Sequence, residues 1–94
     1  MNNDLTDPNM HKVYYGDLIF AMTKHDFANA LTAVEGLEDR DRAAWIEWAV
    51  NYLDENGSKI LAREASEEVT ERCVRCAAFW HANEIIEGRA LRPE

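Results

Sequence analysis

The chain has 94 residues, a length typical of one domain, and its 47% apolar and 10% aromatic content exceeds that of disordered chains. Its formal charge of −8 disfavours direct binding to nucleic-acid phosphates, and no apolar run approaches the roughly 18 residues of a membrane-spanning helix. Because the polar, acidic start also lacks the pattern of a secretion signal, we expect a single helical domain over residues 1–94 in the reducing cytoplasm, with short flexible tails at 1–6 and 89–94.

The segment from residue 8 to residue 22 has two competing interpretations. Asp7-Pro8 is a helix-start signal, and a helix from there to residue 22 places four apolar side chains on one face, namely Tyr15, Leu18, Ile19 and Met22. Alternatively, Gly16-Asp17 is the two-residue turn of a short β-hairpin near residues 12–21. An isolated hairpin is marginally stable and no other strand candidate extends it. The helix is therefore favoured, with the hairpin as the alternative.

Residues 23–36 predict a short helix with clear ends. Thr23 can accept a hydrogen bond from the first helical N–H groups, and Gly36 is the residue type that commonly ends a helix. Between them, one face carries Phe27, Ala30, Leu31 and Val34. This spacing indicates an amphipathic helix of about three turns.

The stretch from Asp41 to Glu55 predicts the central helix of the domain. Its first apolar face consists of Trp45, Trp48, Ala49 and Tyr52, and its second of Ile46, Val50 and Leu53. Large aromatic side chains bury the most area in a core, so we expect this helix to be covered on more than one side. Asn56-Gly57 is expected to end it.

The chain from Lys59 to Glu87 contains no Pro or Gly and predicts further helix. An apolar stripe runs through it at Leu61, Ala65, Val69, Cys73, Cys76 and Trp80. A helix over this whole range would be long for a globular protein. Ser66 is a favoured N-cap residue and can begin a second helix. Gly88 closes the segment. The sum is an all-α fold, a compact bundle of four to five helices, with the hairpin near residues 12–21 as the possible exception.

Cys73 and Cys76 have the spacing of a redox or metal motif, but they fall in the middle of a predicted helix on its apolar stripe. A reactive Cys pair usually lies at a helix N-terminus, and zinc needs four ligands, of which the remainder could come only from the three His residues. We therefore interpret both as small core residues, with redox or metal chemistry as a less favoured alternative. His81 is expected at a helix surface. No nucleophile with a base and no phosphate-binding loop is recognisable, so neither an enzyme nor a cofactor is predicted.

Two features favour protein binding. The nine large aromatic rings exceed the about six or seven that a bundle of this size hides, so some, including Tyr14 and Tyr15, are candidate interface residues. The acids that could face a basic protein partner are Glu38, Asp39, Asp41, Glu47, Glu64, Glu67, Glu68 and Glu71.

The sequence-level hypothesis is a small acidic protein-binding module. Its specific form is an inhibitor encoded by a phage or mobile element, in which the acids replace phosphates on a basic nucleic-acid-binding surface of a host protein. The alternative is a structural homo-oligomer whose exposed rings pair with each other, in which case the charge serves only solubility.

Overall fold

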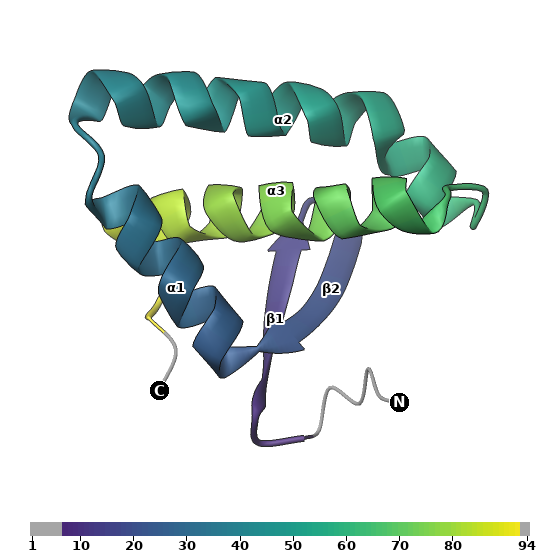
Figure 1. Cartoon of the computed structure of the whole chain (residues 1–94), viewed down its shortest axis with the longest axis horizontal. Helices are drawn as coiled ribbons and strands as arrows, with labels where there is room; N and C mark the ends of the chain where they lie inside the picture. The colour runs from purple at the N-terminus through teal and green to yellow at the C-terminus, as the bar shows by residue number, and fades with distance from the viewer. Residues whose placement is uncertain (1–6, 93–94) are drawn as a thin grey trace.

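The computed structural model describes residues 7–92, which form three helices and one two-stranded antiparallel sheet (Figure 1). In chain order the elements are β1 (Met10–Tyr15), β2 (Leu18–Thr23), α1 (Lys24–Glu35), α2 (Asp39–Leu61) and α3 (Glu67–Ile86). The predicted all-α bundle of four to five helices is therefore wrong, and the hairpin alternative near residues 12–21 is confirmed. The expected N-terminal tail, residues 1–6, lies outside the described residues.

The hairpin forms where a helix was favoured because α3 covers it. Tyr15 pairs with Leu18, which leaves Gly16-Asp17 as the turn, and Gly16 has a φ of +57°, a conformation that suits a residue without a Cβ. Val13 and Leu18 are buried in the common core. Both strands contact α3, so a helix provides the cover that additional strands would otherwise have to provide.

Helix α1 has the ends that its sequence predicts. The Thr23 hydroxyl accepts a hydrogen bond from the Asp26 N–H at 3.0 Å, and Gly36 is the C-terminal cap. Phe27, Leu31 and Val34 are buried, as the apolar spacing indicates.

Helix α2 differs from the prediction in its end and in its buried face. It continues through Asn56-Gly57 to Leu61, because Ile60 beyond the glycine still packs against the core. The side chains buried along α2 are Ala49 and Leu53, whereas Trp45 is 46% and Trp48 53% exposed. The expectation that this helix is the centre of the domain and is covered on more than one side is therefore wrong.

The core is centred on α3, which contacts α1, α2 and both strands. Its Ser66 cap accepts a hydrogen bond from the Val69 N–H at 3.2 Å, so the predicted second helix start is confirmed. The side chains buried along α3 are Cys73, Cys76, Ala77, Ala78, His81, Ala82 and Ile85, most of them small. Small side chains let neighbouring helices approach closely, which leaves no room for a tryptophan between them.

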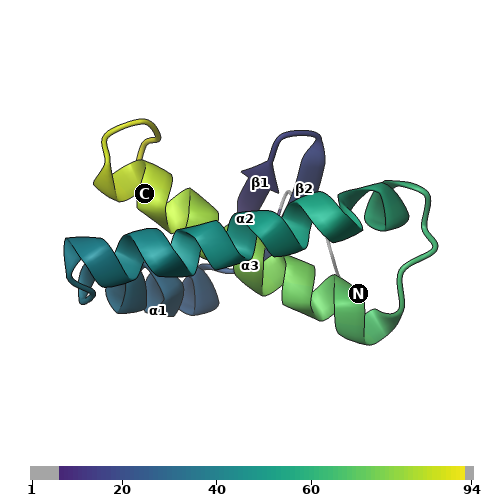
Figure 2. The same ribbon diagram turned by 90° about the horizontal axis from the view of Figure 1, so that it is seen from above.

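The helices and the hairpin form a layered arrangement around α3. Helix α2 runs antiparallel to α3, and an ion pair of 3.3 Å between Arg42 and Glu87 joins the start of α2 to the end of α3. Seen from above, α1 and the hairpin lie on opposite sides of α2 (Figure 2). No helix within residues 7–92 is both long and apolar enough to cross a membrane.

Replacing Gly57 with alanine is expected to raise the free energy of unfolding by about 0.5–1 kcal/mol, because glycine inside a helix is less favourable than alanine by that amount. A Cβ at this position would lie 3.4 Å from Leu18 Cδ1, at the short end of ordinary contact. Urea unfolding followed by circular dichroism measures the change. Gly36→Ala, at a helix end with negative φ, serves as the control with a smaller expected effect. A clear loss of stability for Gly57→Ala would show that Leu18 cannot adjust.

Candidate functional site

Two tryptophans on α2 form an exposed aromatic surface. The Trp45 ring lies 5.5 Å from the Phe79 ring of α3, between centroids, and Trp48 stacks on Tyr52 at 6.2 Å. Their outer faces are open to solvent, because the opposite side of α2 packs on α3. Between the two helices lies a hollow of about 450 Å³, which we call the tryptophan groove; it is lined by Ala44, Trp45, Trp48, Arg75 and Phe79.

The tryptophan groove continues into a second hollow between α1 and α3. The two hollows share Arg75 and Phe79, and the second has a volume of about 510 Å³. Its other lining residues are Met22, Asp26, Asn29, Ala30, Ala33, Glu71, Val74 and Ala78. The result is a mainly apolar surface that extends over three helices and includes two acids, Asp26 of α1 and Glu71 of α3.

Arginines accompany the aromatic rings of this surface. The Arg72 guanidinium lies over the Tyr52 ring, 5.5 Å from its centroid, a cation–π geometry that keeps both groups ordered. Arg75 lines both hollows. Tryptophan, tyrosine and arginine are the residue types that contribute most to protein–protein binding energy. This part of α2 and α3 therefore has the composition of a binding surface.

The acids predicted to contact a partner lie in two groups at opposite ends of the molecule. The first lies at the start of α2 and comprises Glu38, Asp39 and Asp41; the second lies at the turn into α3 and comprises Glu64, Glu67, Glu68 and Glu71. Helix α2, which is about 35 Å long, runs from the first group toward the second, and Glu71 lies farther inward, in the hollow between α1 and α3. Glu47 is exposed between them. The structure therefore brings these acids together as two clusters and not as one face.

The two predicted interface tyrosines lie on the hairpin, away from the tryptophan groove. The Tyr15 hydroxyl donates a hydrogen bond to Asp54 at 2.7 Å, and its ring packs edge-on against Trp80. Burial, and next the hydrogen bond to the Asp54 carboxylate, raise the pKa of Tyr15 to about 12. Tyr15 thus joins the hairpin to α2. Tyr14 is exposed, with its ring 5.0 Å from that of His81.

Cys73 and Cys76 are confirmed as small core residues, since both side chains are fully buried. Burial raises the pKa of both thiols, that of Cys76 to about 11. A redox or nucleophilic cysteine needs the opposite, a lowered pKa and access to solvent. Within residues 7–92, no three His, Cys, Asp or Glu side chains are grouped so as to hold a metal ion.

Sequence reasoning missed a cavity between β1 and α3 that is lined by His11 and His81, which we call the histidine-lined cavity. His81, expected at a helix surface, is only 3% exposed, and its ring lies 5.7 Å from that of His11 on β1. One signal was present: His81 continues the spacing of Cys73 and Ala77, four residues apart, along the buried side of α3. The second signal depended on the hairpin, in which His11 and Val13 share a face.

No protein-family model, no curated protein and no solved structure matches this chain. Its function is therefore inferred from the chemistry and placement of its own side chains. Two surfaces stand out among the described residues, the tryptophan groove on α2 and α3 and the histidine-lined cavity behind the hairpin.

Proposed function

We propose that this chain is a small acidic protein-binding module that docks on a basic protein through its tryptophan groove. The observation that carries the proposal is the exposure of Trp45 and Trp48, about half of each side chain, beside the Phe79 ring. Exposed rings of this size, grouped over an apolar hollow, are typical of interaction sites. We also place the module in the cytoplasm, where its free thiols stay reduced.

Charge complementarity selects the class of partner. The chain carries a net charge of −8, and acidic clusters lie toward both ends of α2, on whose surface the groove opens. A basic protein is attracted to such a surface over a distance of several ångströms, which speeds association. A second copy of the chain would bring two charges of −8 together, so self-association is the less favoured occupant of the groove.

The more specific form of the proposal is inhibition of a nucleic-acid-binding protein, with the acids in place of phosphates. Because the clusters lie toward the two ends of α2, which is about 35 Å long, the basic surface of that partner has to extend along most of this helix. The groove then supplies the apolar centre of the interface and the clusters supply its charged rim. In this form of the proposal, a phage or mobile element encodes the inhibitor and its target is a protein of the host.

The test begins with capture of partners from nuclease-treated source-cell lysate by tagged wild-type protein and by Trp45→Ala/Trp48→Ala. The expected result is a basic protein held by the wild type and lost from the variant. With that partner purified, calorimetry should show that each Trp→Ala change weakens binding by about 30-fold or more, as for hot-spot residues. Leu61→Ala, an exposed apolar residue near the end of α2 and outside the groove, is the matched control and should bind like the wild type.

Three outcomes would contradict the proposal. Equal binding by the tryptophan variant and the wild type would remove the groove as the docking site. Loss of binding only on the charge reversals Glu67→Lys and Glu68→Lys would favour acidic mimicry without the groove. A sedimentation mass that is a multiple of 10.8 kDa, returning to 10.8 kDa in the tryptophan variant, would favour the homo-oligomer.

A further inference from the structure

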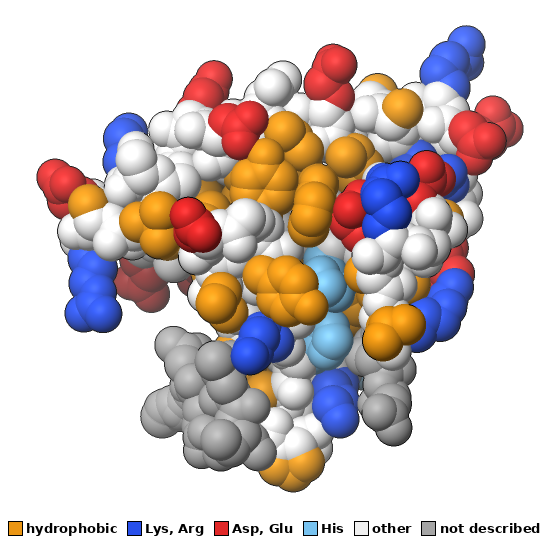
Figure 3. Space-filling view, turned by 180° about the vertical axis from the view of Figure 1, so that it is seen from behind, with side chains coloured by type: hydrophobic (Ala, Val, Ile, Leu, Met, Phe, Trp, Pro, Cys, Tyr) orange, Lys and Arg blue, Asp and Glu red, His pale blue; other side chains and the backbone are white. Residues whose placement is uncertain are grey.

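The histidine-lined cavity opens on the face opposite to that seen in Figure 1 and has a volume of about 590 Å³. Four parts of the chain enclose it: β1, the start of α1, the second half of α3 and the segment that follows α3. Its lining residues are His11, Lys12, Tyr14, Lys24, Trp80, His81, Glu84, Arg89, Ala90, Leu91 and Arg92. Histidine side chains are visible in the hollow, with Lys and Arg side chains around it (Figure 3).

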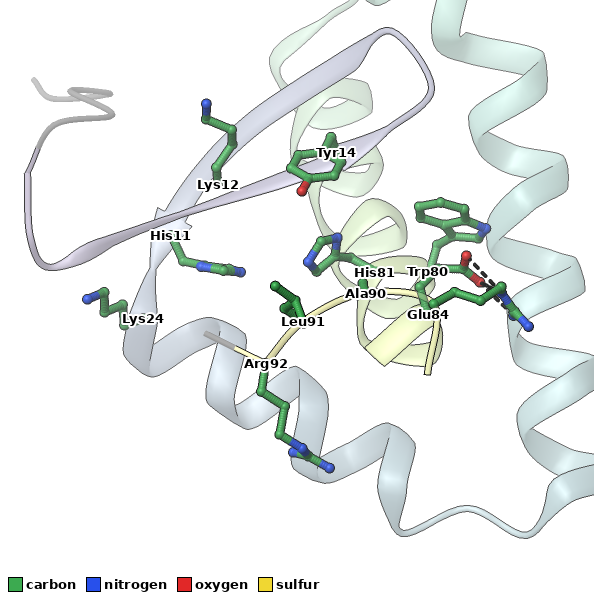
Figure 4. Close-up of a pocket in the computed structure, with 11 residues that line it drawn as sticks. His11, Lys12, Tyr14, Lys24, Trp80, His81, Glu84, Ala90, Leu91 and Arg92 are labelled. Carbon is green, nitrogen blue, oxygen red and sulfur yellow. Dashed lines mark hydrogen bonds and ion pairs between the residues drawn. The ribbon is translucent and has the colours of Figure 1, made fainter. Parts of the chain in front are cut away.

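The two imidazole rings of the cavity have unmet hydrogen-bonding capacity. They point toward one another above Leu91 (Figure 4), and both pack against the Phe27 ring, at 4.4 Å from His11 and 5.4 Å from His81. His11 Nε2 and His81 Nδ1 are shielded from solvent and have no hydrogen-bond partner among the described residues. Buried polar atoms are nearly always paired in folded proteins, so these two nitrogens mark a place for an external group.

The charge around the cavity is opposite to that of the chain as a whole. Four cationic side chains line it, Lys12, Lys24, Arg89 and Arg92, against one carboxylate, Glu84. Two of the four already have partners: Arg89 donates to Glu84 at 2.7 Å, and Arg92 donates to Glu35 at 2.8 Å. Lys12 and Lys24 form no ion pair within residues 7–92. In a protein of net charge −8, a local excess of positive charge favours a small anion.

We propose that the cavity binds a small phosphate-bearing anion, with the His11 and His81 rings donating N–H groups to its oxygens and Lys12 and Lys24 supplying the opposing charge. Phosphate suits this geometry because its several acceptor oxygens can meet donors from different elements at once. A metal ion suits it poorly. The surrounding cations repel it, and no group of three ligands is present in the described part of the chain.

Proton linkage follows from the surroundings of the two rings. Burial is the main cause that lowers the pKa of both, and for His11 the neighbouring His81 and Lys24 lower it further, while Glu84 acts in the opposite direction on His81. Arg89 and Arg92 add positive charge from the segment after α3, and Lys12 adds it from β1. A bound anion favours the protonated rings and raises both pKa values. For a given protonation state of the anion, binding therefore takes up protons at the two rings and should tighten as the pH falls from 8 to 6. Because phosphate itself takes up a proton over this range, the affinities at the two pH values are compared per phosphate dianion.

The experiment is an NMR titration of the histidine ring protons with inorganic phosphate, at pH 6 and pH 8, with ionic strength held constant by KCl. The His11 and His81 signals should shift in a saturable way, whereas His25, exposed on α1 and outside the cavity, is the internal control. For one protonation state of the anion, each unit by which phosphate raises a ring pKa corresponds to at most about tenfold tighter binding at the lower pH. Lys12→Gln/Lys24→Gln should weaken binding by about tenfold, and Lys59→Gln, on the far part of α2, should not.

The lysine variants keep the proposal falsifiable, because both side chains are exposed and their loss should not unfold the chain. Unchanged ring signals at tens of millimolar phosphate would overturn the proposal. So would shifts that KCl reproduces, or shifts that include His25 equally. If Zn²⁺ moves the His11 and His81 signals at micromolar concentration while phosphate does not, the cavity is a cation site and the proposal is wrong.

Discussion

Replacing Phe27 with alanine is expected to lower the free energy of unfolding by about 3–5 kcal/mol. The Phe27 side chain is only 1% exposed and is the largest of the fully buried ones among the described residues. It extends from α1 to contact the rings of His11 on β1 and His81 on α3, so its loss leaves a void where three elements meet. The free energy of unfolding of a domain of this size is about 5–14 kcal/mol, so the substitution would remove a large part of the stability.

Urea unfolding followed by circular dichroism measures this effect, and Trp48→Ala is the matched control. Tryptophan is the larger side chain, but that of Trp48 is half exposed on α2, so its removal is expected to lower the free energy of unfolding by only about 1–2 kcal/mol. The order of the two variants decides between the observed core and the one expected from the sequence. A larger loss for Trp48→Ala than for Phe27→Ala would contradict the core described above.

In the folded protein, Cys73 and Cys76 are expected to react with a thiol reagent at pH 7.5 at least about 100-fold more slowly than in the unfolded chain. Only the thiolate reacts, and the rise in the pKa of Cys76 from 9.0 to about 11 lowers its thiolate fraction by about two orders of magnitude. The complete burial of both side chains slows the reaction further, since reagent has to wait for local opening. Reaction with DTNB, followed by absorbance with and without urea, gives the ratio.

A cysteine placed at an exposed position of the same protein provides the control for this measurement. Ser58→Cys, on the surface of α2, should react at the ordinary rate of a free thiol under native conditions. If Cys73 or Cys76 reacted as fast as that control, the site around them would be open to solvent. The redox interpretation of the pair would then regain support.

Local signals in the sequence predicted the elements whose ends depend on nearby residues. Thr23 and Gly36 delimit α1, and Ser66 begins α3, because caps are formed by side chains within one turn of the helix end. Asn56-Gly57 was expected to end α2, but contacts with the rest of the fold extend the helix to Leu61. Packing of Ile60 on the core favours continuation of α2 by more than one internal glycine opposes it.

The hairpin could not be chosen from its own residues. Between residues 8 and 22 the apolar side chains fit one face of a helix almost as well as the alternation of two strands. What decides between them is the burial of Val13 and Leu18 against a helix that lies some fifty residues later in the chain. The exposure of Trp45 and Trp48 has a similar origin, because the small side chains of α3 select Ala49 and Leu53 for the close contact.

The candidate sites were predictable only in part. Aromatic content and acidic charge indicated a protein-binding surface, but the sequence made the helix that carries Trp45 and Trp48 the centre of the domain. It also grouped the acids without regard to the antiparallel course of α2 and α3. The histidine-lined cavity was invisible, since His11 and His81 are 70 positions apart and meet only in the folded chain. Each of these features depends on contacts between elements, which periodicity within one element does not contain.

The position of α3 after the four elements that it covers has a consequence for synthesis on the ribosome. Helices α1 and α2 and both strands pack against α3, so a nascent chain that stops before residue 67 lacks the main partner for its apolar faces. The growing polypeptide therefore keeps Phe27, Leu31 and Leu53 without their full cover until α3 has left the ribosome, and native packing is completed only then. Until then these faces are available to chaperones, and premature termination within α3 yields a product destined for degradation.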